Sequence, residues 1–74
     1  MVHSDRFVLC MKRGDEEDLE IRKIYETLPD ESAAAKGYLR VVDESGEGYL
    51  YPAAYFVLLH LPIEIEKQLA SARA

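Results

Sequence analysis

Short apolar runs with the two-residue period of β-strands recur along the chain, each bounded by turn-forming residues. These runs predict five strands, over residues 6–12, 19–28, 38–43, 49–51 and 55–61. In the first run, RFVLCMK, one face carries Phe7, Leu9 and Met11 and the other carries Val8 and Cys10. We therefore expect both faces of this strand to be at least partly covered.

The second run, LEIRKIYETL, fits the alternation less well than the others. Its β-branched and aromatic residues favour a strand, which Pro29 ends because the residue before a proline is biased away from the helical region. A helix stays open as the alternative, since Leu19, Ile24 and Leu28 keep rough helical spacing.

Two short helices are expected outside the strands. Residues 30–36 begin with an aspartate, contain an alanine triplet and precede Gly37, which is the usual pattern for one or two helical turns. Pro62 suits the first position of a final helix over residues 62–72, with Ile65, Leu69 and Ala72 as its apolar stripe. This helix should cover an outer face of the sheet, which would explain why strands one and five are apolar on both sides.

Turn signals connect these elements. The acidic run that follows Gly14 has a turn composition, and Glu44-Ser45-Gly46 predicts a hairpin in which Gly46 takes a positive φ. Pro52 lacks the N–H that a central strand would use, so the strand before it should stop there. The two alanines after it fit a tight 3₁₀ turn, and we expect a corner between two strands at this point.

Length and cysteine content limit the architecture. Seventy-four residues are enough for one compact core, so we treat residues 1–74 as a single, mainly β domain. Cys10, the one cysteine, has no partner for an intramolecular disulfide or a zinc motif, and is expected to be a small buried hydrophobe.

The charge balance constrains the partners. Fourteen acidic residues against nine basic ones give a net charge of −5, which argues against nucleic acid and indicates that a charged partner should be basic. The longest apolar run, residues 49–65, is interrupted by prolines and charges and is too short for a membrane helix. Because the N-terminus shows no secretory signal, a cytoplasmic location is the default expectation.

No catalytic, metal or cofactor site is predicted. The acidic cluster at residues 15–18 lacks the alternating spacing of a calcium loop, and it and the acids of residues 43–47 are interpreted as solvated turns. His60 has no nucleophile motif beside it, so a partly buried, hydrogen-bonded histidine is favoured. A small enzyme stays the least favoured alternative, and it would need His60 to meet a carboxylate such as Glu47.

The sequence GYLYPAAYFVLL resembles the Gly-aromatic-x-Pro-Ser-Asn-Tyr-Val ending of SH3 domains, with Pro52 and Tyr55 on matching positions. The order of the elements, with a hairpin before the fourth strand and a 3₁₀ corner before the fifth, is also that of an SH3-like barrel. A closer resemblance, over residues 19–62, is to small bacterial proteins with the pattern KIYxxLPDxxAxxxGxLRVxDESGExYLYPxxYF, a family without an established activity. We therefore expect a small five-stranded SH3-like barrel.

SH3 domains bind extended, proline-rich ligands between aromatic rings, with acids in the loop between strands one and two. The resemblance implies a non-catalytic module that binds a protein or peptide. In this sequence the first loop is expected to be only a few residues long, and the chain has no tryptophan. The candidate binding residues are Tyr49, Tyr51, Pro52, Tyr55, Asp15, Glu16, Glu17 and Asp18, although strand propensity alone could account for the tyrosines.

The alternative is a structural role through self-association, by pairing of an exposed strand edge with the same edge of a second copy.

Overall fold

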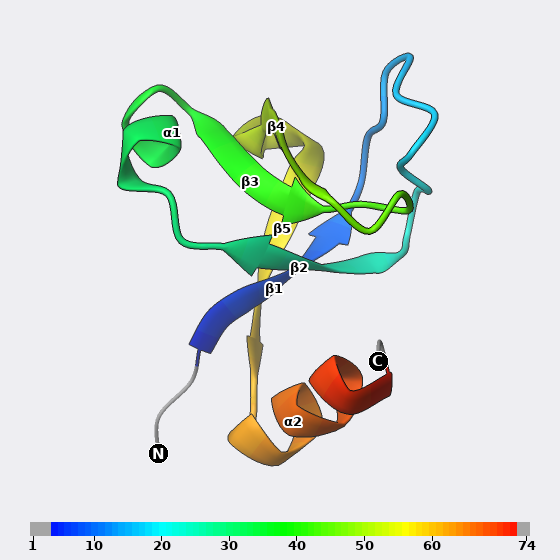
Figure 1. Ribbon diagram of the computed structural model, residues 1–74, viewed down its shortest axis with the longest axis vertical. Helices are drawn as coiled ribbons and strands as arrows, with labels where there is room; N and C mark the ends of the chain where they lie inside the picture. The colour runs from blue at the N-terminus through cyan, green and yellow to red at the C-terminus, as the bar shows by residue number, and fades with distance from the viewer. Residues whose placement is uncertain (1–3, 73–74) are drawn as a thin grey trace.

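A computed structural model of the chain describes the backbone of residues 4–72 and the side chains of residues 6–69. It contains five strands, two α-helices and one 3₁₀ turn (Figure 1). In chain order these are β1 (Ser4–Cys10), β2 (Ile24–Leu28), α1 (Glu31–Ala35), β3 (Tyr38–Val42), β4 (Gly48–Pro52), η1 (Ala53–Tyr55), β5 (Phe56–Leu61) and α2 (Ile63–Ala72).

The five strands form one antiparallel sheet in the order β4-β3-β2-β1-β5. This confirms that the domain is mainly β. Within the described residues β4 and β5 are the two edges of the sheet and are not hydrogen-bonded to each other, so the sheet is open. Closure into a barrel stays a prediction.

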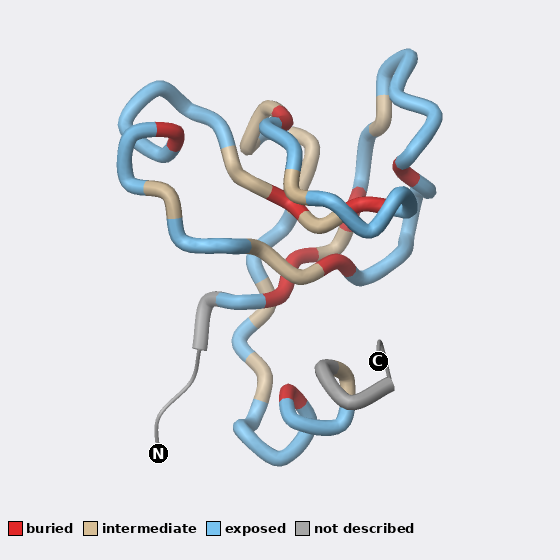
Figure 2. The backbone as a smooth tube through the Cα atoms, in the orientation of Figure 1, coloured by how far each residue is buried: buried red, intermediate tan, exposed pale blue. Residues whose placement is uncertain are grey.

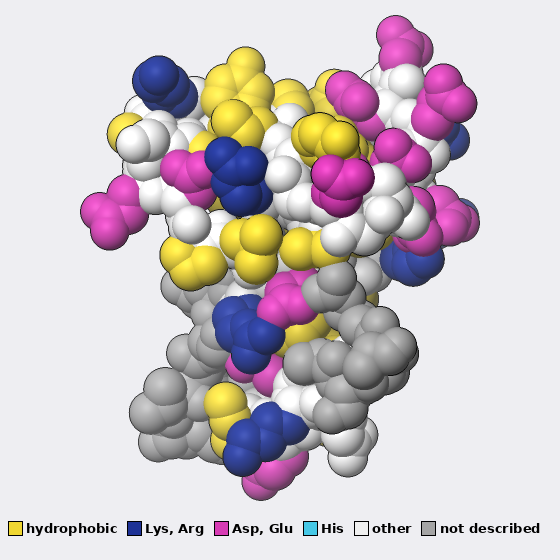
Figure 3. Space-filling model, in the orientation of Figure 1, with side chains coloured by type: hydrophobic (Ala, Val, Ile, Leu, Met, Phe, Trp, Pro, Cys, Tyr) yellow, Lys and Arg dark blue, Asp and Glu magenta, His cyan; other side chains and the backbone are white. Residues whose placement is uncertain are grey.

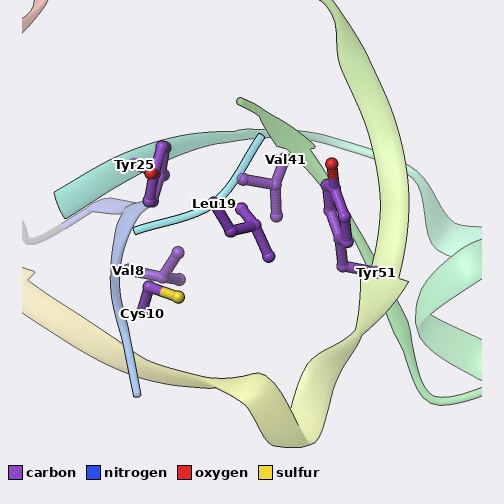
Figure 4. Close-up of a cluster of buried hydrophobic side chains, with 6 residues drawn as sticks. All are labelled: Val8, Cys10, Leu19, Tyr25, Val41 and Tyr51. Carbon is purple, nitrogen blue, oxygen red and sulfur yellow. The ribbon is translucent and has the colours of Figure 1, made fainter. Parts of the chain in front are cut away.

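One face of the sheet, which we call the inner face, carries the core. The register places Val8, Tyr25, Val41 and Tyr51 on this face, and all four side chains are buried. They pack with Cys10 in a single cluster (Figure 4), and Figure 2 shows that the buried segments of the chain lie mostly in the sheet and the loop beside it. Cys10 is fully buried, as predicted, and burial raises the pKa of its thiol.

The sequence signals around α1 and η1 are confirmed. The Asp30 side chain accepts a hydrogen bond from the Ala33 N–H at 3.0 Å, which satisfies one of the free amides at the start of α1. Gly37 follows the helix with a φ of 82°. Pro52 ends β4, and the η1 turn leads directly into β5, so the proline does mark a corner between two strands.

The second predicted strand is only half correct. Residues 19–23 are neither strand nor helix, and β2 begins at Ile24. Arg22 has a φ of 67°, a left-handed conformation that interrupts an extended strand before β2. The helical alternative for this segment is wrong as well.

The connection between β1 and β2 is a loop over residues 11–23, not the few residues expected from sequence. The strand β1 ends at Cys10 because the N–H groups of Met11 and Lys12 both donate to the Tyr55 carbonyl, at 2.7 and 3.1 Å. The chain then folds back so that Leu19 is buried at the centre of the core cluster (Figure 4). This loop is therefore part of the core packing.

Helix α2 lies against β1 on the opposite, outer face, where Phe7 is buried (Figure 1). Both faces of β1 are thus covered, as expected. Strand β5 is different: Val57 and Leu58 are 50% and 43% exposed, so the expectation that α2 explains two covered faces on this strand is wrong. The helix packs on β1 and leaves much of β5 in solvent.

The apolar stripe expected on α2 is also wrong in part. Ile65 is 42% exposed, Leu69 is half-buried, and the side chain of Ala72 lies outside those described. The residue turned inward is Glu66, which is fully buried. Neither of its carboxylate oxygens has a hydrogen-bond partner among the described residues.

Replacing Glu66 should stabilise the protein. An unpartnered buried polar group costs free energy, so Glu66→Leu is expected to raise the free energy of unfolding by about 1–2 kcal/mol. Urea denaturation measures this change, and Glu64→Leu, an exposed glutamate of the same helix, is the matched control with little expected gain. A loss of stability in Glu66→Leu would show that the carboxylate is satisfied in solution.

Candidate functional site

A groove on the protein surface is bounded by the loop of residues 11–23 and by strand β4. It has a volume of about 300 Å³ and is lined by Glu16, Asp18, Tyr49, Leu50 and Tyr51. The Tyr49 side chain is half exposed, whereas Tyr51 is buried beneath the groove. An acidic rim thus lies beside an aromatic and aliphatic wall, and we call this site the acidic groove.

The acidic run of the loop, residues 15–18, is held in place by contacts near both of its ends. Gly14 adopts a φ of 55°, and a Cβ at this position would lie 2.6 Å from the Tyr55 hydroxyl. Further along, the Asp18 carbonyl accepts a hydrogen bond from the Glu44 N–H at 3.0 Å. The loop is therefore fixed to the η1 turn at one point and to the β3–β4 hairpin at the other.

The hairpin turn contains a buried carboxylate beside the groove. Asp43 is 5% exposed and accepts a hydrogen bond from the Tyr51 hydroxyl at 2.6 Å. The Ser45 N–H and hydroxyl both donate to its other oxygen. Burial alone would raise the pKa of Asp43, but these hydrogen bonds outweigh it and hold the pKa below its ordinary value of 3.8.

Tyr51 is fixed by the same contact. Burial raises the pKa of its hydroxyl, and the hydrogen bond to Asp43 and the nearby charges of Glu16 and Asp18 raise it further. The Tyr51 hydroxyl is therefore a neutral hydrogen-bond donor at physiological pH, and its ring is held in one position at the floor of the groove.

A second polar network ties the hairpin to β2. The Tyr25 hydroxyl donates to a Glu44 carboxylate oxygen at 2.7 Å and accepts from the Glu20 N–H at 2.7 Å. Lys23 forms an ion pair with the same Glu44 oxygen, and this contact lowers the pKa of Glu44. Loop, hairpin and sheet are thus connected through one carboxylate.

The structure brings together four of the eight predicted binding residues: Tyr49, Tyr51, Glu16 and Asp18. Asp15 and Glu17 are exposed on the same loop but do not line the groove. Neither Pro52 nor Tyr55 lines it either.

Pro52 and Tyr55 have structural positions. The register pairs Pro52 with Tyr38, which places it on the outer face of the sheet. The Tyr55 ring packs against the ring of Phe56 at 6.4 Å between centroids, and its hydroxyl lies against Gly14.

Sequence reasoning missed Leu50 and misjudged the acids of the hairpin. Leu50 lines the groove. Asp43, interpreted from sequence as part of a solvated turn, is buried because Tyr51 and Ser45 satisfy its carboxylate. Its position directly after a run of alternating strand residues was the available signal, since the first turn residue can still lie under the sheet.

A second hollow, of about 270 Å³, lies between the sheet and α2. Its lining includes Phe7 of β1, Ile24 of β2, Val42 of β3 and Leu69 of α2. The ion-paired groups Lys23, Glu26 and Glu44 also line it, so its polar side chains are already engaged with one another or with Arg6.

The partial burial predicted for His60 is wrong. His60 is exposed, because the end of β5 that carries it extends beyond the core toward α2 (Figures 1 and 2). Neither His60 nor Glu47 lines either hollow. Over the residues that the structure describes, three or more His, Cys, Asp or Glu side chains do not gather in a way that could hold a metal ion.

Neither of the described helices, α1 and α2, is long and apolar enough to cross a membrane.

Comparison of the chain with known protein families, with curated proteins and with solved structures finds no match.

Proposed function

We propose that the protein is a non-catalytic interaction module, a small SH3-like barrel whose acidic groove binds a basic side chain of an extended protein or peptide partner. The observation that carries this proposal is that two carboxylates of the loop, Glu16 and Asp18, line the same groove as Tyr49, Leu50 and Tyr51. The order of the strands in the sheet and the η1 turn between β4 and β5 support the proposed SH3-like architecture.

The chemistry of the groove favours an arginine or a lysine. A guanidinium can pair with a carboxylate through two parallel hydrogen bonds while its flat face or its methylene stem lies on an aromatic ring. Tyr49 offers an exposed ring next to those carboxylates. The net charge of −5 would also attract a basic partner at long range.

The floor of the acidic groove is held in place, which favours specific binding of a basic side chain over non-specific electrostatic attraction. Tyr51 is fixed by Asp43, and the loop is fixed through Asp18 and Gly14. A preformed site loses less conformational entropy on binding than a mobile one.

We expect short extended peptides with one central arginine to bind the groove, and peptides with glutamine at that position to bind about tenfold more weakly or worse. Amide chemical shifts, recorded while peptide is added to the labelled protein, measure the affinity and locate the site. The shifts should concentrate at residues 16–18 and 49–51, and binding should weaken as salt is added.

The loop offers a matched pair of variants. Glu16→Gln with Asp18→Asn removes the two groove carboxylates, and Asp15→Asn with Glu17→Gln removes the same charge from neighbouring positions that do not line the groove. The first variant should lose about tenfold in affinity and the second much less. Equal losses would show that only net charge matters, and the absence of shifts with every peptide would contradict the groove as a site.

A further inference from the structure

The acidic groove runs along a free edge of the sheet. Three of the residues that line it are consecutive, Tyr49, Leu50 and Tyr51 of β4. Neighbouring residues of a strand point to opposite faces of a sheet, so a hollow that touches all three lies at the edge of the strand. Strand β4 is the last in the sheet order, and within the described residues only β3 is hydrogen-bonded to it. The groove therefore borders the unpaired backbone of β4.

The register shows which backbone groups of β4 point away from β3. At one end of the β3–β4 ladder, the Asp43 N–H donates to the Glu47 carbonyl at 3.2 Å. Antiparallel pairs alternate between those that exchange hydrogen bonds and those that do not, so the pair of Arg40 and Leu50 does not exchange them. The Ala53 N–H donates across the other end of the ladder at 2.9 Å and fits the same alternation. The N–H and the carbonyl of Leu50 therefore point outward from the sheet.

Within the described residues, β4 offers a complete outward donor and acceptor at one position. Gly48 and Pro52 also face outward in this register, but the Gly48 carbonyl accepts a hydrogen bond from the Arg40 guanidinium at 3.1 Å, and a proline has no N–H. None of the turn, loop and side-chain hydrogen bonds among the described residues reaches the N–H or the carbonyl of Leu50. An added strand can thus exchange both hydrogen bonds at Leu50 alone, which fixes its register.

The loop on the other side of the groove selects the strand that can be added. Glu16 and Asp18 line the groove opposite β4. Acidic side chains gather at the upper right of Figure 3, where Figure 1 shows the loop of residues 11–23. A second copy of this chain would bring its own acidic loop toward these carboxylates and would be repelled, whereas a basic extended segment is attracted. The charge of the groove therefore favours a basic peptide at this edge.

We infer that a basic peptide binds in the acidic groove as an added antiparallel strand, paired with β4 at Leu50. This inference rests on the proposed function and adds the backbone geometry of binding to it. The peptide residue opposite Leu50 exchanges two main-chain hydrogen bonds with it. Because the strands are antiparallel, the next peptide residue lies opposite Tyr49 and shares its face of the sheet. An arginine at that place meets the exposed Tyr49 ring.

Ester bonds in the peptide test this pairing. The probe is a blocked seven-residue peptide of alternating valine and threonine with a central arginine, in which an ester oxygen replaces a single amide N–H. The N–H of the residue just before the arginine donates to the Leu50 carbonyl, so the ester at this place should weaken binding roughly three- to tenfold. The matched control has the ester one residue earlier. There the lost N–H points away from β4, and the altered carbonyl faces Pro52, which has no N–H to donate, so little change is expected.

Amide exchange of the labelled protein gives a second readout, because the Leu50 N–H should exchange more slowly once the unmodified peptide is bound. If arginine-dependent binding persists but the two esters act alike and the Leu50 N–H is not protected, strand addition is overturned and the proposed function stands. If no peptide binds, both are overturned. Protection of the Leu50 N–H that rises with protein concentration in the absence of peptide would show that a second copy occupies this edge, and would overturn the inference as well.

Discussion

Leu19→Ala is expected to lower the free energy of unfolding by about 2–5 kcal/mol, because it leaves a cavity at the centre of the core. Leu19 is 1% exposed and packs in the cluster with Val8, Tyr25, Val41 and Tyr51 (Figure 4). A loss of this size is a large fraction of the stability of a small domain. Urea denaturation followed by circular dichroism measures it.

Two variants make this experiment decisive. Ile21→Ala, two residues further along the same loop, removes a side chain that is 51% exposed and should change stability little. Leu19→Met conserves volume and should cost less than about 1.5 kcal/mol, which keeps the test informative if Leu19→Ala does not fold. Equal effects of the two alanine variants would mean that the loop does not close the core in solution.

The middle of the chain, from Asp30 to the η1 turn, follows local rules, and its structure was largely predictable. Asp30 caps α1, Gly37 and Gly46 take the positive φ angles that their turns need, and Pro52 ends β4 before the η1 turn. Each of these features depends on residues next to one another in the sequence. Local steric and hydrogen-bonding preferences therefore decide them.

The first loop and the last helix depend on contacts between distant segments. Leu19 is the one large apolar residue between Lys12 and Glu20, and its burial requires the loop to fold back onto strands that the pattern alone does not place. Similarly, the side of α2 that faces inward is set by how the helix meets β1. Periodicity indicated Ile65 and Leu69, but the packing buries Glu66.

In the candidate site, too, some features follow from the local sequence and others depend on contacts between distant segments. Sequence identified the acidic run and the tyrosines as a group, and the structure selects Glu16, Asp18, Tyr49 and Tyr51 from it. Adjacent loop residues point in different directions, so the path of the loop decides which carboxylates reach the groove. That path is fixed by the contact of Gly14 with Tyr55 and by the Asp18 carbonyl, both of which are long-range.

Asp43→Ala is expected to lower the free energy of unfolding by about 3 kcal/mol at neutral pH, because it removes several hydrogen bonds to a charged acceptor and leaves a buried hydroxyl without a partner. That hydroxyl belongs to Tyr51, which forms the floor of the acidic groove. The variant should therefore also weaken peptide binding, because the ring of Tyr51 is no longer fixed.

We also expect the stability difference between the wild type and Asp43→Ala to depend on pH, and the shifted pKa of Asp43 gives the direction of that change. The pKa of Asp43 is lower in the folded protein than its ordinary value of 3.8, so the unfolded chain takes up the proton first as the pH falls. The stability contributed by ionised Asp43 is complete at neutral pH and is lost as the pH falls below that value and through the folded pKa. The difference between wild type and Asp43→Ala should therefore shrink over this acidic range.

Glu47→Gln provides the matched control, because it removes one negative charge from an exposed position of the same hairpin. Its unfolding free energy should stay close to that of the wild type at every pH, since an exposed charge contributes little. Urea midpoints of the wild type and the two variants, measured from neutral pH into the acidic range, distinguish the effect of a buried, hydrogen-bonded carboxylate from that of an exposed negative charge. A wild-type advantage over Asp43→Ala that stays constant with pH would show that packing alone, and not the ionised carboxylate, holds Tyr51 in place.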